Sequence, residues 1–354
     1  MIRNKRETGF EILRVLAMFL IGAVHVMNYG GMLANAPQST ILWQRLIYSV
    51  FVVSVNVFVL ISAYFMVCSR LRITKLIKLW CLVFAYSVIS YLVASIFLFD
   101  NFTFGGLMSS CFPILKNKYW FFTAYFILML LSPVLNKVLH NSSKKELYIL
   151  ILFLFGLTCV ATRMEIGSVF NLDGGYTVFW FCILYLIAGT LRLYPINLGK
   201  KKCIVLYVLL TIILWLNSGI ATSNSVALFF INSLDYTSPL VLICSILLIL
   251  IFKDINIQNT LIHNSICFVS SLTFGIYLTQ ESSIKPYLYF NILKVQSFYN
   301  SSYAPLGVLL FALGILIFGL IIELVRKFLL ILFNRLTHRK KTTSDNISIS
   351  ENNQ

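Results

Sequence analysis

The feature that most constrains the fold is a series of long apolar stretches. Ten stretches have roughly the length that a helix needs to cross a bilayer, about 20 residues. They are residues 11–33, 46–67, 77–99, 119–137, 147–162, 176–194, 203–217, 236–252, 265–284 and 305–334. Only helices that pair their own backbone groups cross hydrocarbon in this way. With 59% hydrophobic and 11% charged residues, the chain is predicted to be an all-α polytopic integral membrane protein with about ten transmembrane helices.

The distribution of basic residues predicts the orientation. With the N-terminus in the cytoplasm, 22 of the 28 Lys and Arg residues fall in cytoplasmic segments, as the positive-inside rule requires. Ten spans also return the basic end of the chain to the cytoplasm, so both termini are predicted to be cytoplasmic. One uncertainty is residues 218–235, which form either an outer loop or a further re-entrant piece. We expect one membrane domain over residues 1–336 and a polar disordered tail over residues 337–354.

The composition also excludes some classes of function. The net charge of +16 has a topological explanation, so nucleic acid is not an expected partner, whereas membrane lipid is. Eight cysteines are scattered through the chain without a C-x-x-C pair, and we therefore expect no metal site.

Polar residues interrupt the first apolar stretch in a regular pattern. Arg14 and His25 are eleven residues apart, which is three helical turns plus about 20°, so both lie on one face. Glu11 and Asn28 extend the same stripe by three residues at either end. The rise from Arg14 to His25 is roughly 16 Å, about half the hydrocarbon thickness. The stripe should therefore face protein or water and connect the cytoplasmic surface with the membrane interior.

Each polar residue has a structural and a functional interpretation. His25 is the only histidine predicted within a span; it either joins two helices by a hydrogen bond or accepts a proton from a hydroxyl. Arg14 either sets topology beside Glu11 or binds a phosphate of a ligand at the cytoplasmic surface. Arg70 and Arg72 lie at the same surface, where such clusters commonly reflect topology or anionic lipid.

These residues, taken in order, resemble the membrane acyltransferase-3 family. Arg14 and His25 match its R-x10-H signature, and Arg70-x-Arg72 is similar to its second basic motif. The stretch "YWFFTAYFILMLLSPVLN" at 119–136 is similar to a W-F-x-x-x-Y-x-x-x-x-L-x-P segment, and residues 174–194 and "LTFGIYLTQE" at 272–281 resemble two later segments. The resemblance covers positions 8 to about 284. One departure is "YLTQE", where many members have His after "YL"; Gln280 cannot act as an acid or base.

The resemblance implies a membrane O-acyltransferase. Its donor would be cytoplasmic acyl-CoA, most simply acetyl-CoA, as a co-substrate rather than a permanently bound cofactor, and its acceptor a hydroxyl of a surface polysaccharide or of its lipid-linked precursor. The resemblance assigns catalysis to His25 and Glu11, with Glu11 holding Arg14, and donor binding to Arg14, Arg70 and Arg72. The residues implied for the acceptor region are Asn28, Trp120, Tyr125 and Glu281. It also implies a bacterial plasma membrane and, as possible partners, polysaccharide assembly proteins.

Three alternatives stay open at this point. A transporter or flippase for lipid-linked sugars would also combine many spans with buried polar groups, although the sequence shows no convincing pair of interrupted helices. A non-catalytic member of an assembly complex would not need His25. A glycan polymerase would lengthen a chain instead of acylating it.

Overall fold

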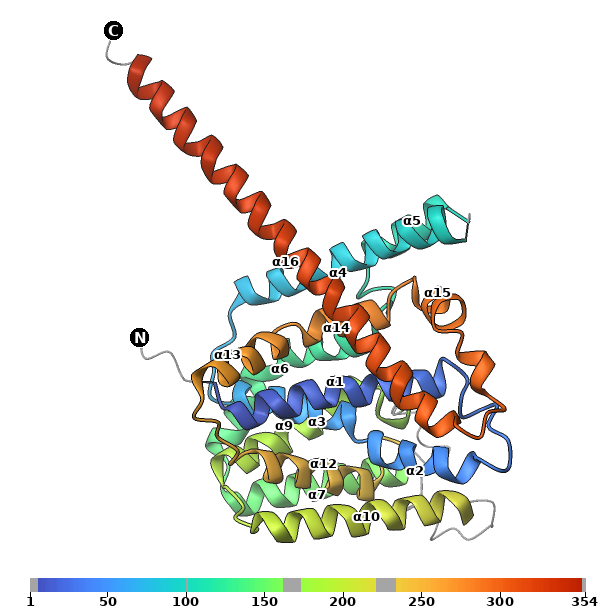
Figure 1. Cartoon of the computed structure of the whole chain (residues 1–354). Coiled ribbons are helices and arrows are strands. Elements are labelled where there is room, and N and C mark those ends of the chain that lie inside the picture. The colour runs from blue at the N-terminus through green and yellow to red at the C-terminus, as the bar shows by residue number, and fades with distance from the viewer. Residues whose placement is uncertain (1–5, 100, 162–172, 221–233, 352–354) are drawn as a thin grey trace.

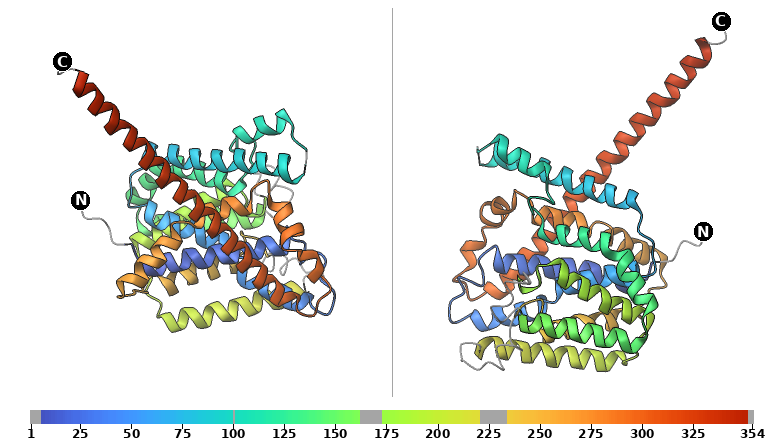
Figure 2. Two further views of the ribbon diagram at one scale, coloured as in Figure 1. Left: turned by 45° about the horizontal axis from the view of Figure 1, so that its top comes forward. Right: turned by 180° about the vertical axis from the view of Figure 1, so that it is seen from behind.

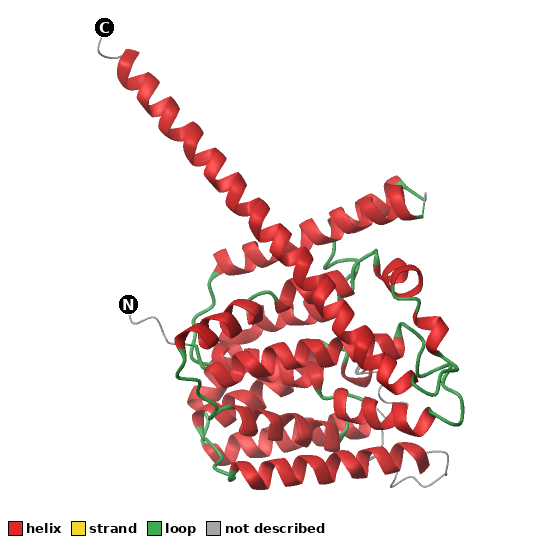
Figure 3. Cartoon of the chain, viewed as in Figure 1, coloured by secondary structure: helices red, strands yellow, loops and turns green. Residues whose placement is uncertain are grey.

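The computed structural model describes residues 6–99, 101–161 and 173–220, and then 234–351, and these are arranged as helices joined by loops, without a strand (Figure 3). The longer helices are α1 (Thr8–Asn28), α2 (Ile41–Phe51), α3 (Ser54–Met66), α4 (Ile73–Leu92), α6 (Trp120–Asn141), α7 (Lys144–Ala161), α9 (Val178–Leu193), α10 (Lys200–Ile220), α12 (Pro239–Phe252), α13 (Thr260–Ser270) and α16 (Ala304–Glu351). The shorter elements are η1 (Val93–Leu98), α5 (Phe104–Cys111), η2 (Asp173–Gly175), α14 (Thr273–Gln280), α15 (Lys285–Tyr287), η3 (Leu288–Ile292) and η4 (Val295–Phe298).

The helices confirm a multi-pass membrane protein. Seven helical segments are long and apolar enough to cross a bilayer, and α9 and α12 are shorter apolar helices. All ten predicted spans coincide with described helices, since α7 matches the remaining one. The possible re-entrant piece within 218–235 lies largely outside the described residues.

The direction of the helices bears on the number of crossings. Ser270 at the end of α13 contacts Arg14 near the start of α1, whereas Gln280 at the end of α14 contacts His25 near the end of α1. The segment α13–α14 therefore runs parallel to α1. If only the seven long segments crossed the membrane, α13–α14 would be the sixth crossing and would run antiparallel to α1. An odd number of further crossings must therefore precede α13. Crossings by α7, α9 and α12 would satisfy this condition, and ten remains the predicted number.

Helix α1 lies in the middle of the bundle (Figure 1). It packs against α2, α3, α12, α13, α14 and α16, and most of its residues are buried. Gly9 makes the close approach to the end of α12 possible, because a Cβ there would lie 1.9 Å from the carbonyl oxygen of Phe252. From Glu11 to His25 the polar stripe is thus largely enclosed by protein, as its cost in hydrocarbon demands, whereas Asn28 at its end is exposed.

Two of the spans beside α1 are interrupted. The span Ile41–Met66 breaks at residues 52–53 between α2 and α3, and the span Thr260–Gln280 breaks at residues 271–272 between α13 and α14. The sequence does not reveal the first break, because the apolar pattern continues through Val52 and Val53, whereas the serine pair at 270–271 precedes the second. After this interruption, α14 lies beside the C-terminal part of α1, where His25 lies.

Two buried polar side chains away from α1, Asn56 and Glu323, are paired with neighbouring groups. On α3, the Asn56 amide donates to the carbonyl oxygen of Tyr236 at 2.8 Å and accepts from the indole Nε1 of Trp180 at 2.9 Å. On α16, the buried carboxylate of Glu323 accepts from Tyr86 at 2.5 Å and from Arg326 at 2.6 and 2.7 Å. Such pairing is expected inside a membrane, where an unpaired polar group is costly.

The C-terminal end differs from the expectation. Helix α16 continues to Glu351, through most of the segment predicted to be a disordered tail, and extends away from the bundle (Figures 1 and 2). Extending an existing helix adds one hydrogen bond per residue without a new nucleus, so α16 can propagate through a polar sequence that lacks apolar periodicity. The start of α1 and the end of α16 lie on the same side of the bundle (Figure 2), as an even number of crossings requires.

Candidate active site

His25 is held at both ring nitrogens by the end of α14. Its Nδ1 lies 3.0 Å from Oε1 of Gln280, so Nδ1 carries the proton and donates it to the amide oxygen. Its Nε2 lies 3.1 Å from Oε1 of Glu281. The ring is buried, with 8% of its surface exposed, and Gln280 is fully buried. A neutral imidazole held in this tautomer presents Nε2 as its proton acceptor.

Oε1 of Glu281 lies close to Nε2 of His25, but the two atoms do not form an aligned hydrogen bond. Oε1 of Glu281 is buried and accepts no hydrogen bond from any described residue, although Nε2 is near it. The other carboxylate oxygen, Oε2, lies 3.2 Å from Nζ of Lys285. The Nε2 lone pair therefore points past the carboxylate, which stands beside it at a distance suited to stabilise a positive imidazolium.

The space next to His25 is small and mostly apolar. A cavity of about 10 Å³ is lined by His25, Trp120 and Tyr277 together with apolar side chains of α1, α3, α6 and α14. That volume holds about one water molecule. It therefore fits a single hydroxyl group beside the imidazole.

Two residues on the face of α1 between Arg14 and His25 line the cavity beside the imidazole. Met18 and Ile21 lie between them at helical spacing, and both line the same cavity as His25. The predicted stripe is thus polar at its two ends and apolar in its middle. This arrangement suits a thioester whose charged part stays at one end while its acyl group reaches the other.

Glu11 and Arg14 belong to the far end of this face. Nη1 of Arg14 donates to Oε2 of Glu11 at 2.8 Å and contacts Oγ of Ser270 at 3.5 Å, and the Ser270 hydroxyl also donates to Glu11. Glu11 is therefore placed to hold Arg14, as expected. Its predicted catalytic role lacks geometric support, because Glu11 precedes His25 by fourteen residues, about 21 Å along the helix.

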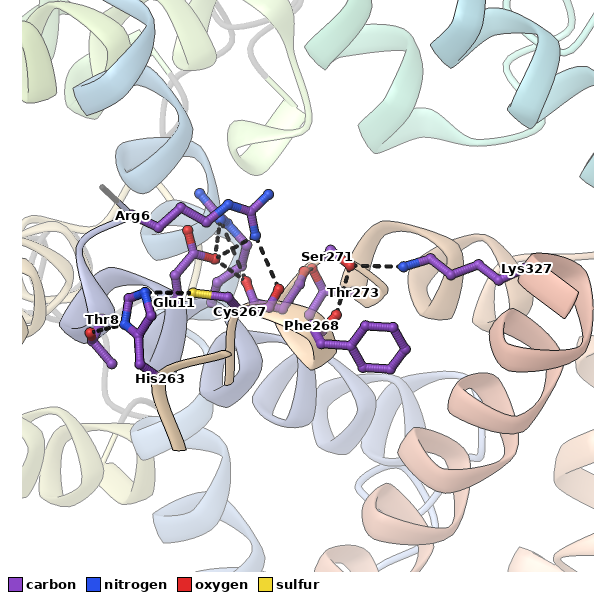
Figure 4. Close-up of polar contacts among 11 residues, drawn as sticks. Arg6, Thr8, Glu11, His263, Cys267, Phe268, Ser271, Thr273 and Lys327 are labelled. Carbon is purple, nitrogen blue, oxygen red and sulfur yellow. Dashed lines mark hydrogen bonds and ion pairs between the residues drawn. The ribbon is translucent and has the colours of Figure 1, made fainter. Parts of the chain in front are cut away.

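Figure 4 shows the polar contacts that join α1 and α13 at this end. Nη1 of Arg6 lies 3.8 Å from Glu11 and donates to the carbonyl oxygen of Cys267 at 3.0 Å. His263 connects the Thr8 hydroxyl, at 2.7 Å, with the Cys267 thiol, at 3.6 Å. Arg6 and Arg14 thus share one buried carboxylate, which leaves a net positive charge at this end.

Other basic residues gather at the same end. Arg192, at the end of α9, lies 3.4 Å from Glu7 and 4.7 Å from the ring of Tyr64 on α3. Arg70 and Arg72 follow α3, so they emerge at this end too, and both are exposed. Neither forms an ion pair within the described part of the chain. Neither side chain is therefore held in place by a carboxylate, whereas Arg14 is held by Glu11.

The residues predicted for the acceptor region separate into two groups. Trp120 lines the cavity beside His25, and Glu281 contacts His25 directly. Tyr125 lies about a turn and a half further along α6, where its ring stacks on Phe121 and its hydroxyl contacts Sδ of Met66 at 3.8 Å. Asn28 is exposed and donates to the hydroxyl of Tyr48 at 3.2 Å. The structure thus brings Trp120 and Glu281, but not Tyr125 and Asn28, to the imidazole.

Sequence reasoning missed several residues of this site. The sequence excludes Gln280 from proton transfer but does not predict that it orients His25, and it does not single out Lys285. Lys285 also lies over the ring of Tyr29, with Nζ 3.6 Å from its centroid, and this ring is 5.1 Å from that of His25. The spacing of Glu281 and Lys285, one helical turn, was the signal available in the sequence.

Comparison with known families agrees with this geometry. The profile of the acyltransferase-3 family, described as an acyltransferase domain, matches residues 7–325. The chain belongs to the acyltransferase-3 family. No curated protein and no solved structure matches it. Family membership and the long apolar helices identify a multi-pass membrane acyltransferase. The matched region includes the full face of α1 from Glu11 to His25 and the contacts of His25 with Gln280 and Glu281.

Proposed function

We propose that this acyltransferase moves an acetyl group from cytoplasmic acetyl-CoA to a hydroxyl of a surface polysaccharide or of its lipid-linked precursor. The observation that carries the proposal is the single face of α1 that holds Arg14 at one end and the oriented imidazole of His25 at the other. The apolar residues between them, Met18 and Ile21, suit a small acyl group and its thioester. The clustered basic residues at the Arg14 end suit the phosphates of CoA.

The chemical step follows from the tautomer of His25. Gln280 holds the proton on Nδ1, so Nε2 takes the proton of the acceptor hydroxyl as the oxygen attacks the thioester carbonyl. The new C–O bond forms, the C–S bond breaks, and the thiolate of CoA takes the proton from the imidazolium. The products are the acyl ester and CoA with a free thiol, and His25 returns to its neutral form.

Glu281 assists the same step without exchanging a proton with substrate. When Nε2 is protonated, the carboxylate 3.1 Å away offsets its charge, and Lys285 keeps the other carboxylate oxygen in place. This electrostatic assistance is largest when charge develops, so it lowers the barrier more than it strengthens binding.

Two features near His25, the small cavity and the ring of Trp120, support a polysaccharide acceptor. The cavity admits one hydroxyl, and Trp120 provides an aromatic surface that can stack on a sugar ring. The same proposal places the chain in a bacterial plasma membrane, where it would work beside polysaccharide assembly proteins.

The test is transfer of labelled acetyl from acetyl-CoA to surface glycans in cells that express the native chain or His25→Ala. We expect alkali-labile label with the native chain and none with the variant, at equal protein abundance in the membrane. Undiminished label with His25→Ala would remove His25 from the reaction. No label with the native chain, after several acyl donors and the host's own glycan have been tried, would refute the proposal and favour transport or a non-catalytic role.

A further inference from the structure

Helix α13 carries a thiol and an imidazole that meet a hydroxyl at the start of α1 (Figure 4). Sγ of Cys267 lies 3.6 Å from Nε2 of His263, one helical turn earlier on α13. Nδ1 of the same ring lies 2.7 Å from Oγ1 of Thr8 on α1. The reaction at His25 uses none of these three groups. A nucleophile next to a base that a third group orients is the arrangement that activates a side chain for attack.

The contact with Thr8 sets the tautomer of His263. Thr8 is buried, with 2% of its surface exposed, and it belongs to another helix, so its hydroxyl holds the ring from outside α13. With the ring proton on Nδ1, donated to Oγ1 of Thr8, the lone pair of Nε2 faces the thiol. His263 is therefore placed to take the proton of Cys267.

The surroundings of Cys267 suit a reactive thiol. Its side chain is partly exposed, whereas Cys203 and Cys244 are buried. Nη1 of Arg6 donates to the carbonyl oxygen of Cys267 at 3.0 Å. A partly exposed position beside a cation is the usual environment of a reactive cysteine. Because Arg6 belongs to the basic cluster that suits the phosphates of CoA, the electrophile available at this end is an acyl thioester.

We propose that Cys267 is a second acyl acceptor, which takes an acyl group from acyl-CoA as a thioester, with His263 as general base. This inference rests on the donor named in the proposed function. His263 takes the proton of the thiol at Nε2, and the thiolate attacks the thioester carbonyl. The C–S bond to Cys267 forms, the C–S bond to CoA breaks, and the CoA thiolate takes the proton back from the imidazolium. The products are S-acylated Cys267 and CoA with a free thiol, without an oxidant or a reductant.

This acceptor is separate from the reaction at His25. Cys267 precedes Gln280, which holds the imidazole of His25, by thirteen residues, about 20 Å along α13–α14. An acetyl group on Sγ of Cys267 does not span that distance. Acylation of Cys267 should therefore not require His25.

The matched comparison is with a second cysteine at the same end of the bundle. Cys68 follows α3 and is more exposed than Cys267. Its thiol is not hydrogen-bonded to a histidine in the part of the chain that the structure describes. If access alone governed acylation, Cys68 would react first, whereas activation by His263 favours Cys267.

The experiment incubates the purified full chain in detergent with labelled acetyl-CoA, without a glycan, and locates the label by peptide mass spectrometry. We expect acetyl on Cys267, released by neutral hydroxylamine as thioesters are, and no comparable label on Cys68. Relative to folded protein, His263→Gln should slow labelling by about 10²-fold or more, because the general base is lost. Thr8→Val should slow it by about threefold to tenfold, the effect of one hydrogen bond. His25→Ala should be labelled at the native rate.

A parallel assay of glycan acetylation by the native chain separates this inference from the proposed function. An acetylated glycan without a thioester on Cys267 would overturn the second acceptor and leave the proposed function standing. A thioester on Cys267 without an acetylated glycan would support the second acceptor and count against the proposed function, and no label on either would overturn both. Labelling of Cys68 as fast as Cys267, or undiminished labelling in folded His263→Gln, would refute activation by His263.

Discussion

Replacing Glu281 with Gln tests the electrostatic role of the site most directly. The change keeps the size of the side chain and removes its negative charge. At the observed separation of 3.1 Å between Nε2 and Oε1, Coulomb's law with an effective dielectric constant of about 20 gives an upper limit of roughly 5 kcal/mol for stabilising the imidazolium. Lys285, 3.2 Å from the other oxygen, already offsets part of this charge. We therefore expect kcat to fall by about 10²–10⁴.

The assay is steady-state transfer of labelled acetyl to a glycan acceptor by purified protein, normalised to folded protein. Because the interaction strengthens only as charge develops, kcat and kcat/KM should fall by similar factors, with little change in KM for acetyl-CoA. The control is Glu323→Gln, which alters a buried carboxylate paired with Arg326 away from His25. It should lower stability and leave kcat of the folded fraction intact. A kcat for Glu281→Gln within threefold of the native value would refute the assistance by Glu281.

Two further substitutions test the role of Arg14 at the other end of α1 and the stability of helix α7. Arg14→Ala should raise the KM for acetyl-CoA by about 10-fold to 100-fold, because a charge-assisted contact with phosphate is lost. Arg14→Lys should have an intermediate effect, and the acceptor KM should not change in either variant. An unchanged KM for acetyl-CoA in Arg14→Ala would contradict the phosphate role. At the start of α7, the Ser143 hydroxyl accepts from the amide of Glu146 at 3.3 Å, and the Glu146 carboxylate accepts from the amide of Ser143 at 2.7 Å. Ser143→Ala should lower the free energy of unfolding by about 1 kcal/mol without affecting kcat, measured by thermal unfolding in detergent. The amide of Ser143 lowers the pKa of Glu146, so the contribution of this carboxylate is present above its unfolded pKa. That contribution should be lost as the pH falls through the lowered pKa, and a Ser143→Ala effect on kcat would contradict a purely structural role.

The helical membrane fold could be predicted from the sequence because its causes are local. Hydrocarbon forces the backbone to pair within each span, so an apolar stretch such as 305–334 already specifies a helix. Helical periodicity placed Arg14 and His25 on one face for the same reason. The break at 52–53 could not be predicted, because apolar residues tolerate either a continuous or an interrupted helix there, and packing against α1 selects the latter. The serine pair at 270–271 was the available signal for the second break.

The partners of His25 were decided by tertiary structure alone. Gln280 and Glu281 lie more than 250 positions away, and only the parallel packing of α13–α14 against α1 brings them to the two ring nitrogens. The same packing separates Glu11, which contacts Arg14, from Glu281, which contacts the imidazole. The sequence by itself thus determined the helices and the ends of the polar stripe, since these depend on solvent and local periodicity. The choice of base, carboxylate and acceptor contacts depended on which helices pack together, and no local pattern encodes that.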